Sequence, residues 1–402
     1  MPRPLRWLFG ATVLAIAGIV VALPYMDAAA FIARAADLPG PPATLAAWRA
    51  SDAGPISSFE ITTRHGDVAA RVSRPSGRFH RTIVLVPGVH RDGIDEARLV
   101  GLAQDLVATG FAVLTVAAPD LQRFRITPAV TDVIEDAIRW ASDQAELAPD
   151  GRVGVLGVSF SGGLSIVAGG RDRIRDRLAF IVSFGGHGDL SRVMHYLASG
   201  EVLGDLDAAR RSRVVLGAEH VQVHPPHDYG VAVVLLTVAG ELVPAEQVAP
   251  LTAGIEGFLL ASSLDMVDKP RALEEFARMR AYAETLPEPS ATLMRFVNDR
   301  AVGDLGTRLL PIVDKLADHP AMPTLSPEKA PAAPRAPVYL LHGSDDNVIP
   351  SIETVLLGEY LQGRAPVTGL LSGLITHAEV NRAPTATEAW RLASFWRQVF
   401  GR

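Results

Sequence analysis

A serine set among glycines is the strongest candidate in this sequence for a catalytic residue. The stretch from Gly157 to Gly163 reads Gly-Val-Ser-Phe-Ser-Gly-Gly, after an apolar run at 153–156 and before apolar residues at helical spacing. At a sharp strand-to-helix turn a serine hydroxyl is exposed as a nucleophile, and the pattern for this turn is Gly-x-Ser-x-Gly. The pattern fits imperfectly in two registers, centred on Ser159 or on Ser161. Because the apolar run ends at Gly157, Ser159 falls at the bend and is the favoured nucleophile; a glycine-rich turn with an incidental serine is the alternative.

Later segments supply a base and an acid. A serine hydroxyl attacks a carbonyl only when a base takes its proton, and the base needs a partner that fixes its tautomer. His377 and the pair Asp345-Asp346 each follow a short apolar run near the end of the chain. The order along the chain is serine, acid, histidine, and because the carboxyl ends of parallel strands share one edge of a sheet, the three groups could meet there. Asp189 is a further candidate for the acid, and the non-catalytic alternatives are an aspartate-rich turn and a loop histidine.

The elements that must position these groups alternate between strands and helices. Short apolar or β-branched runs predict strands, and apolar residues at helical spacing predict helices. This alternation favours a largely parallel sheet with helices on both faces, an α/β fold. The predicted strands are 57–63, 68–73, 82–86, 111–117, 153–156, 178–184, 338–342 and 367–371, and the predicted helices are 95–109, 128–145, 352–361 and 385–399.

The alternation breaks between His187 and Ala336, which predicts an inserted, mainly helical cap over the carboxyl edge of the sheet. Two amphipathic helices are expected, at 271–286 and 291–316, the second broken or kinked before Pro311. The apolar run at 231–239 fits either a strand or a helix. The inserted segment ends in a proline-rich stretch from Pro320 to Pro337, which predicts an extended return to the sheet.

With these motifs the chain resembles enzymes of the α/β-hydrolase fold. The resemblance covers roughly residues 57–186 and 337–402. In that family the acid often lies in a segment similar to His-Gly-x-x-Asp-x-x-Val-Pro, which here places it at Asp346. The resemblance also implies an oxyanion hole formed by the backbone N–H groups of Phe160 and Val89, although Pro87 stands where the family's loop commonly has histidine.

The activity that this resemblance implies is hydrolysis of a carboxylic ester by a triad of Ser159, His377 and Asp346, through an acyl-enzyme. Cleavage of a peptide, an amide or a thioester is the enzymatic alternative, because a triad does not select the leaving group. A catalytically silent binding protein of the same fold is the alternative outside enzymology. The sequence leaves open the acyl group, the leaving group, the cap conformation and the oligomeric state.

An apolar amino terminus predicts export and a membrane anchor. Residues from Trp7 to Met26 are almost uninterruptedly apolar, with Arg3 and Arg6 before them and Asp27 after them. Twenty residues span about 30 Å as a helix, enough to cross a bilayer, and the positive flank places the rest of the chain outside the cytoplasm. The alternative is a signal peptide that is cleaved after the small residues 28–30, which would give a secreted or periplasmic protein.

The expected divisions of the chain are an anchor or signal segment at 1–30, a linker at 31–56, the first part of the core at 57–186, the cap at 187–336 and the second part of the core at 337–402.

Composition narrows the chemistry further. The chain has 402 residues, of which 48% are hydrophobic and 20% are charged, as in globular proteins, and its net charge of −6 gives no reason to expect nucleic acid as a partner. The absence of cysteine excludes disulfides, thiolate catalysis and cysteine-ligated zinc. The segment His224-Pro-Pro-His227-Asp228 has the look of a metal motif, but two prolines make it a rigid turn without an evident third ligand. No phosphate-binding or dinucleotide motif is found either, so we expect no cofactor. The small acyl substrate that we expect is what the resemblance implies.

Overall fold

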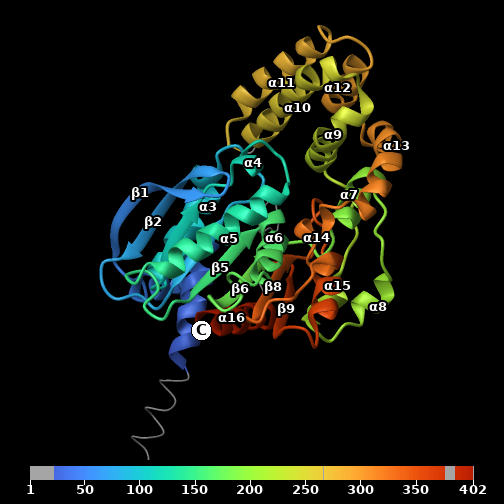
Figure 1. The fold of residues 1–402 in the computed structure, drawn as a ribbon. Helices are drawn as coiled ribbons and strands as arrows, with labels where there is room; N and C mark the ends of the chain where they lie inside the picture. The colour runs from blue at the N-terminus through green and yellow to red at the C-terminus, as the bar shows by residue number, and fades with distance from the viewer. Residues whose placement is uncertain (1–21, 266, 376–384, 402) are drawn as a thin grey trace, which may run out of the picture.

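A nine-stranded, mostly parallel sheet forms the centre of the computed structural model, which describes residues 22–265, 267–375 and 385–401 (Figure 1). The strand order is β1-β2-β4-β3-β5-β6-β8-β9-β7. The first two strands form an antiparallel hairpin and β2 pairs antiparallel with β4, whereas the other pairs are parallel. The strands are β1 Ala53–Thr63, β2 Gly66–Pro75, β3 Thr82–Val86, β4 Ala112–Val116, β5 Val153–Val158, β6 Leu178–Phe184, β7 Val215–Leu216, β8 Val338–Gly343 and β9 Val367–Ser372.

Helices cover both faces of the sheet, as predicted. Successive residues of β3 alternate between the two faces: Val84 and Val86 pack into one apolar core and Ile83 and Leu85 into the other. The first core is closed by α5 and α6, and the second by α3, α16 and the helix at residues 22–35. These helices are α3 Ala97–Ala108, α5 Pro128–Asp143, α6 Phe160–Gly169 and α16 Ala386–Phe400, with α4 Pro119–Gln122, η1 Gly93–Asp95 and α15 Ile352–Leu361 in the remaining connections.

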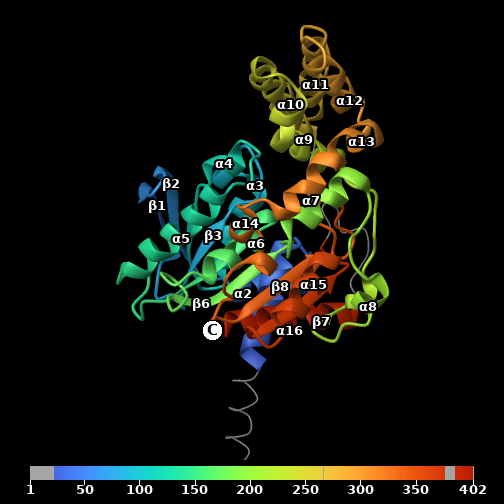
Figure 2. The same cartoon turned by 45° about the vertical axis from the view of Figure 1, so that its right-hand side comes forward.

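The segment between β6 and β8 is largely helical, and part of it stands away from the sheet as a lobe made of α9 to α13 (Figures 1 and 2). The run at 231–239, which the sequence left open, is part of helix α9. The short strand β7 pairs with β9 at the edge of the sheet, an element that the sequence did not predict. The elements of this segment are α7 Leu190–Ser199, α8 Leu206–Arg210, β7, η2 Ala218–His220, α9 Asp228–Leu242, α10 Ala245–Asp265, α11 Lys269–Ala283, α12 Ser290–Asn298, α13 Val302–Val313, η3 Asp314–Asp318, α14 Met322–Leu325 and η4 Pro327–Lys329.

Two details of the predicted cap were wrong. The helix expected at 291–316 is indeed broken, but at residues 299–301, where Arg300 has a φ of 54°, and not next to Pro311, which lies inside α13 near its end. A left-handed residue stops a helix, whereas a proline inside a helix removes only the hydrogen bond of its own missing N–H. The proline-rich return is not simply extended, because it forms α14 and η4. Pro323 and Pro327 lie in the first turns of these helices, where no N–H donor is needed.

The amino-terminal anchor stays a prediction. Residues 1–21, which contain most of the apolar run, lie outside the described residues. Among the residues that the structure describes, no helix has both the length and the apolar character that crossing a bilayer requires.

The segment predicted as a linker is partly helical. It contains the end of the helix at 22–35 and helix α2 Pro41–Trp48 before β1 begins. These helices are fixed to each other, since Arg49 pairs with Asp27 at 2.5 Å and the Arg34 side chain donates to the carbonyl of Ala46 at 3.0 Å.

Candidate active site

Ser159 lies at a strained turn between β5 and α6. Its φ of 59° and ψ of −133° are unusual for a residue with a side chain, and α6 begins with the next residue, Phe160. Such backbone strain costs on the order of 1–3 kcal/mol and is concentrated at functional sites. The Ser159 N–H donates to the carbonyl of Phe184 in β6 at 2.7 Å, which fixes the turn at the carboxyl edge of the sheet. A Cβ on Gly157 would lie 2.3 Å from the carbonyl oxygen of Ser161, so only glycine allows the helix to fold back this closely.

Ser161, the centre of the alternative register, is fully buried in the first turn of α6. Its hydroxyl donates a short hydrogen bond to the carbonyl of Pro87 at the end of β3. The hydroxyl that replaces the usual glycine therefore has a structural partner, which ties α6 to the loop after β3. Of the two serines, only Ser159 occupies the bend itself.

The loop after β3 approaches the Ser159 turn closely. A Cβ on Gly88 would lie 3.3 Å from the Ser159 Cβ and 3.4 Å from the carbonyl oxygen of Val158, so the backbone of the loop lies directly against the turn. Val89, the predicted donor in this loop, is half-buried, and its carbonyl accepts a hydrogen bond of 2.8 Å from the Tyr229 hydroxyl. Phe160 is buried, with its N–H at the start of α6, where helix N–H groups have no partner within the helix.

Asp346 is buried in the turn after β8, whereas its neighbour Asp345 is exposed. One oxygen of Asp346 accepts hydrogen bonds from the N–H groups of Val348 at 2.8 Å and Ile349 at 3.0 Å. The other oxygen lies 3.2 Å from Nε2 of His342. These bonds fix the orientation of the carboxylate, and the burial distinguishes Asp346 from Asp345.

The alternative acid, Asp189, has a structural role. Its side chain caps α7 by accepting from the N–H and the hydroxyl of Ser191, and it pairs with Lys329 at 3.2 Å. Burial acts to raise the pKa of the Asp189 carboxyl, but the hydrogen bond from Ser191 and the charge of Lys329 hold that pKa below its usual value. The carboxylate is thus already neutralised by its own neighbours.

His377 lies outside the described residues, so its position relative to Ser159 stays a prediction. The described chain approaches this position from β9, which pairs with β8 along its whole length. Gly343, at the end of β8, packs against Ile375, because a Cβ there would lie 2.3 Å from the Ile375 carbonyl oxygen. The segment leading to His377 therefore begins beside the segment that carries Asp346.

The metal-like motif also has a structural explanation. At the start of α9, Nδ1 of His227 lies 2.7 Å from Oδ1 of Asp228, and the same carboxylate oxygen accepts from the N–H of Tyr229 at 2.9 Å. In the part of the chain that the structure describes, no group of three or more histidine or acidic side chains is arranged to hold a metal ion.

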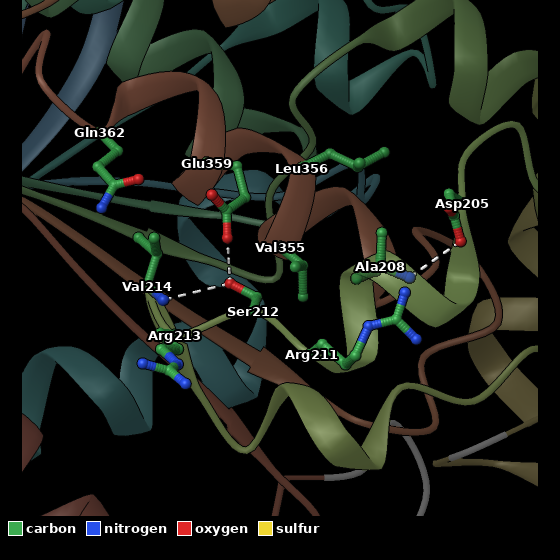
Figure 3. A pocket seen from close by; sticks show the side chains of 11 residues that line it. Asp205, Ala208, Arg211, Ser212, Arg213, Val214, Val355, Leu356, Glu359 and Gln362 are labelled. Atoms are coloured by element: carbon green, nitrogen blue, oxygen red, sulfur yellow. Dashed lines mark hydrogen bonds between the residues drawn. The ribbon is translucent and has the colours of Figure 1, made fainter.

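Surface cavities lie near the inserted segment. One of about 530 Å3 lies between α8 and α15, where Ser212 donates to Glu359 and Arg211 and Arg213 line the wall (Figure 3). It contains none of the predicted site residues. Another, of about 260 Å3, is lined by Arg91, which follows the loop after β3, and by residues of α10 and α11. The second cavity is the one that adjoins the loop carrying Val89.

Comparisons with known proteins give only distant structural similarities. No family model matches the chain, and no curated protein matches its sequence. Brefeldin A esterase, described as a bacterial homologue of human hormone sensitive lipase, is 15% identical with a TM-score of 0.43, over 94% of this chain and 84% of its own. The esterase of Pyrobaculum calidifontis is 15% identical with a TM-score of 0.41, over 95% and 91%. The acylaminoacyl peptidase of Pyrococcus horikoshii is 11% identical with a TM-score of 0.43, over 89% and 43%. Similarity this low carries neither activity nor substrate to this chain.

The architecture itself identifies the fold. A mostly parallel sheet carries a serine at a sharp turn between strand and helix, with the loop after β3 packed against that turn. The acidic segment follows a later parallel strand, beyond an inserted helical lobe. By these features the chain has the α/β-hydrolase fold.

Proposed function

We propose that this protein is a serine hydrolase that cleaves carboxylic esters. In this proposal Ser159 Oγ attacks the ester carbonyl carbon while His377 takes its proton, and Asp346 orients the imidazole. The alcohol leaves with the proton from His377, and a water molecule then releases the acid from the acyl-enzyme by the same steps. The N–H groups of Phe160 and Val89 stabilise the oxyanion.

The observation that carries the proposal is the strained conformation of Ser159. A positive φ at a non-glycine residue needs support from the surrounding structure. Here that support comes from Gly157 and Gly88, which allow α6 and the loop after β3 to lie against the turn. The same arrangement leaves the peptide N–H of Phe160 at the free end of a helix, where negative charge is stabilised.

The position of the acid supports the same mechanism. Asp346 follows β8, which is separated from β5 by only one strand, β6. The chain that leads to His377 leaves the sheet from β9, the next strand along. A histidine that lies between the ends of β5 and β8 could contact Ser159 on one side and Asp346 on the other.

A fluorophosphonate probe tests the nucleophile. The wild-type protein should be labelled covalently, Ser159→Ala should not, and Ser161→Ala is the matched control that should still be labelled. Loss of labelling in Ser161→Ala with retention in Ser159→Ala would reverse the assignment. A folded wild-type protein that never labels would contradict the hydrolase proposal.

The substrate class needs a second test. A panel of short acyl esters, thioesters and peptide amides separates an esterase from a thioesterase or a peptidase, which use the same triad. Activity confined to amides would refute the ester assignment. Inactivity toward every member of the panel would favour the catalytically silent binding protein.

A further inference from the structure

The turn that begins helix α9 contacts both the loop after β3, which carries Val89, and the turn after β8, which carries Asp346. This turn, His224 to Tyr229, contains the two histidines and two prolines of the metal-like sequence motif. It belongs to the inserted segment, and α9 lies at the base of the lobe (Figures 1 and 2). Its contacts reach the loop after β3 on one side and the turn after β8 on the other.

The contact with the loop after β3 is made by Tyr229. Its hydroxyl donates to the carbonyl of Val89 at 2.8 Å, across 140 residues of sequence. On the other side of Gly88, the carbonyl of Pro87 is held by the hydroxyl of Ser161. The peptide that carries the Val89 N–H therefore lies between two peptides that are each held by a side-chain hydrogen bond.

The contact with the turn after β8 is made by the backbone. The N–H of His227 donates to the carbonyl of Asn347 at 2.9 Å, next to Asp346. The Tyr196 hydroxyl donates to the carbonyl of His224 at 2.8 Å, which fixes the start of the turn to α7. One short segment of the cap thus links the proposed oxyanion loop to the acid segment.

The turn is itself held in place. Asp228 pairs with His227 at 2.7 Å and with Arg300 at 3.1 Å, and the Tyr229 ring packs edge-on against Phe124 at 6.2 Å between centroids. Burial raises the pKa of the Tyr229 phenol, so the hydroxyl stays protonated and able to donate. The orientation of Tyr229 is therefore set by several independent contacts.

From this geometry we infer that Tyr229 is a positioning residue, which holds the oxyanion loop so that the Val89 N–H faces the reacting carbonyl oxygen. This inference rests on the proposed hydrolase function. The inserted segment then contributes to the chemical step through its contact with this loop. Because the Val89 N–H matters most when the oxyanion forms, losing the hydrogen bond should affect the transition state more than substrate binding.

Tyr229→Phe tests the inference, since it removes the hydroxyl and keeps the ring against Phe124. The kcat for a p-nitrophenyl ester should fall about five- to tenfold, the size expected for one hydrogen bond. KM should change less than twofold, and inhibition by phenylboronic acid, which forms a tetrahedral adduct on the serine, should weaken in proportion to kcat. Tyr282→Phe is the matched control, because it removes a hydroxyl-to-carbonyl bond to Pro250 that lies within the lobe. It should leave kcat and boronate inhibition unchanged.

The outcomes separate this inference from the proposed function. An inactive wild-type protein refutes the hydrolase itself, whereas an active wild type with an unchanged kcat in Tyr229→Phe refutes only the positioning role. Equal losses in Tyr229→Phe and Tyr282→Phe would also refute it, because they would reflect general loosening of the cap. If Tyr229→Phe does not fold, Arg300→Gln replaces it. That variant removes the ion pair to Asp228 beside Tyr229 and should lower kcat in the same direction, and an unchanged kcat would overturn the inference.

Discussion

We expect His187 to make the stability of this protein fall as the pH is lowered from about 6.5 to about 4. The side chain is fully buried in the middle of the loop after β6 and packs on the ring of Phe160, with 5.6 Å between ring centroids. Its Nε2 lies 2.7 Å from the carbonyl of Leu325 and so carries the proton, while Nδ1 has no hydrogen-bond partner among the described residues. A second proton would sit on Nδ1 without an acceptor.

The magnitude follows from the pKa. Burial lowers the pKa of His187 to about 4 from its ordinary 6.5, against smaller opposing effects of the Leu325 carbonyl and Asp189. At pH values between these two figures the unfolded chain binds a proton at this site and the folded protein does not. The folded state is therefore stabilised fully above pH 6.5 and loses that stability as the pH falls towards 4. The loss comes to about 3 kcal/mol, at roughly 1.4 kcal/mol for each pH unit.

Urea unfolding of the wild type and of His187→Gln, at pH 7 and at pH 4, measures this contribution. Glutamine can still donate to the Leu325 carbonyl but does not titrate, so groups elsewhere in the protein should contribute equally to both curves. The advantage of the wild type over the variant should shrink by about 3 kcal/mol between the two pH values. Parallel pH dependences in the two proteins would refute the reasoning, because they would mean that His187 takes up its proton in the folded state as readily as in the unfolded chain.

Two further predictions concern buried polar contacts near the site. Ser161→Ala should lower the free energy of unfolding by about 1–3 kcal/mol, because the buried Pro87 carbonyl loses its side-chain donor. Urea denaturation measures this loss of stability. An unchanged midpoint would show that this bond contributes nothing. Arg192→Met should cost about 3–5 kcal/mol at pH 7, since Glu353, 2% exposed, loses the guanidinium that pairs with it at 2.8 Å and keeps only the N–H groups of Gly188 and Asp189. The double variant with Glu353→Gln should recover much of this loss, and a single variant as stable as the wild type would contradict the prediction.

The sequence predicted the core of the fold closely because its signals are local. The β-branched run 82–86 is strand β3, and the helix expected at 352–361 is α15 with the same bounds. The periodicity of side chains along a strand or helix depends on a few neighbouring residues, so it can be read without tertiary contacts. The same applies to the Ser159 turn, where glycines mark the close approach of strand and helix.

The cap was predicted less well because its boundaries depend on packing. The run at 231–239 has β-branched residues that suit a strand, yet it forms helix α9, in which every residue of the run except Thr237 is buried in the lobe. Strand β7 has only two residues and exists because β9 offers an open edge beside it. Neither the edge nor the lobe interior is visible in the local pattern.

The sequence by itself determined which residues could do chemistry, since residue type, order along the chain and position after a strand are all written in it. Only the tertiary structure decided how the remaining groups are used. It gave Ser161 a partner in Pro87, made Asp189 a helix cap, buried Asp346 and exposed Asp345, and brought Tyr229 to Val89. Such contacts join residues far apart in sequence, and their geometry is fixed only when the sheet and the inserted lobe pack together.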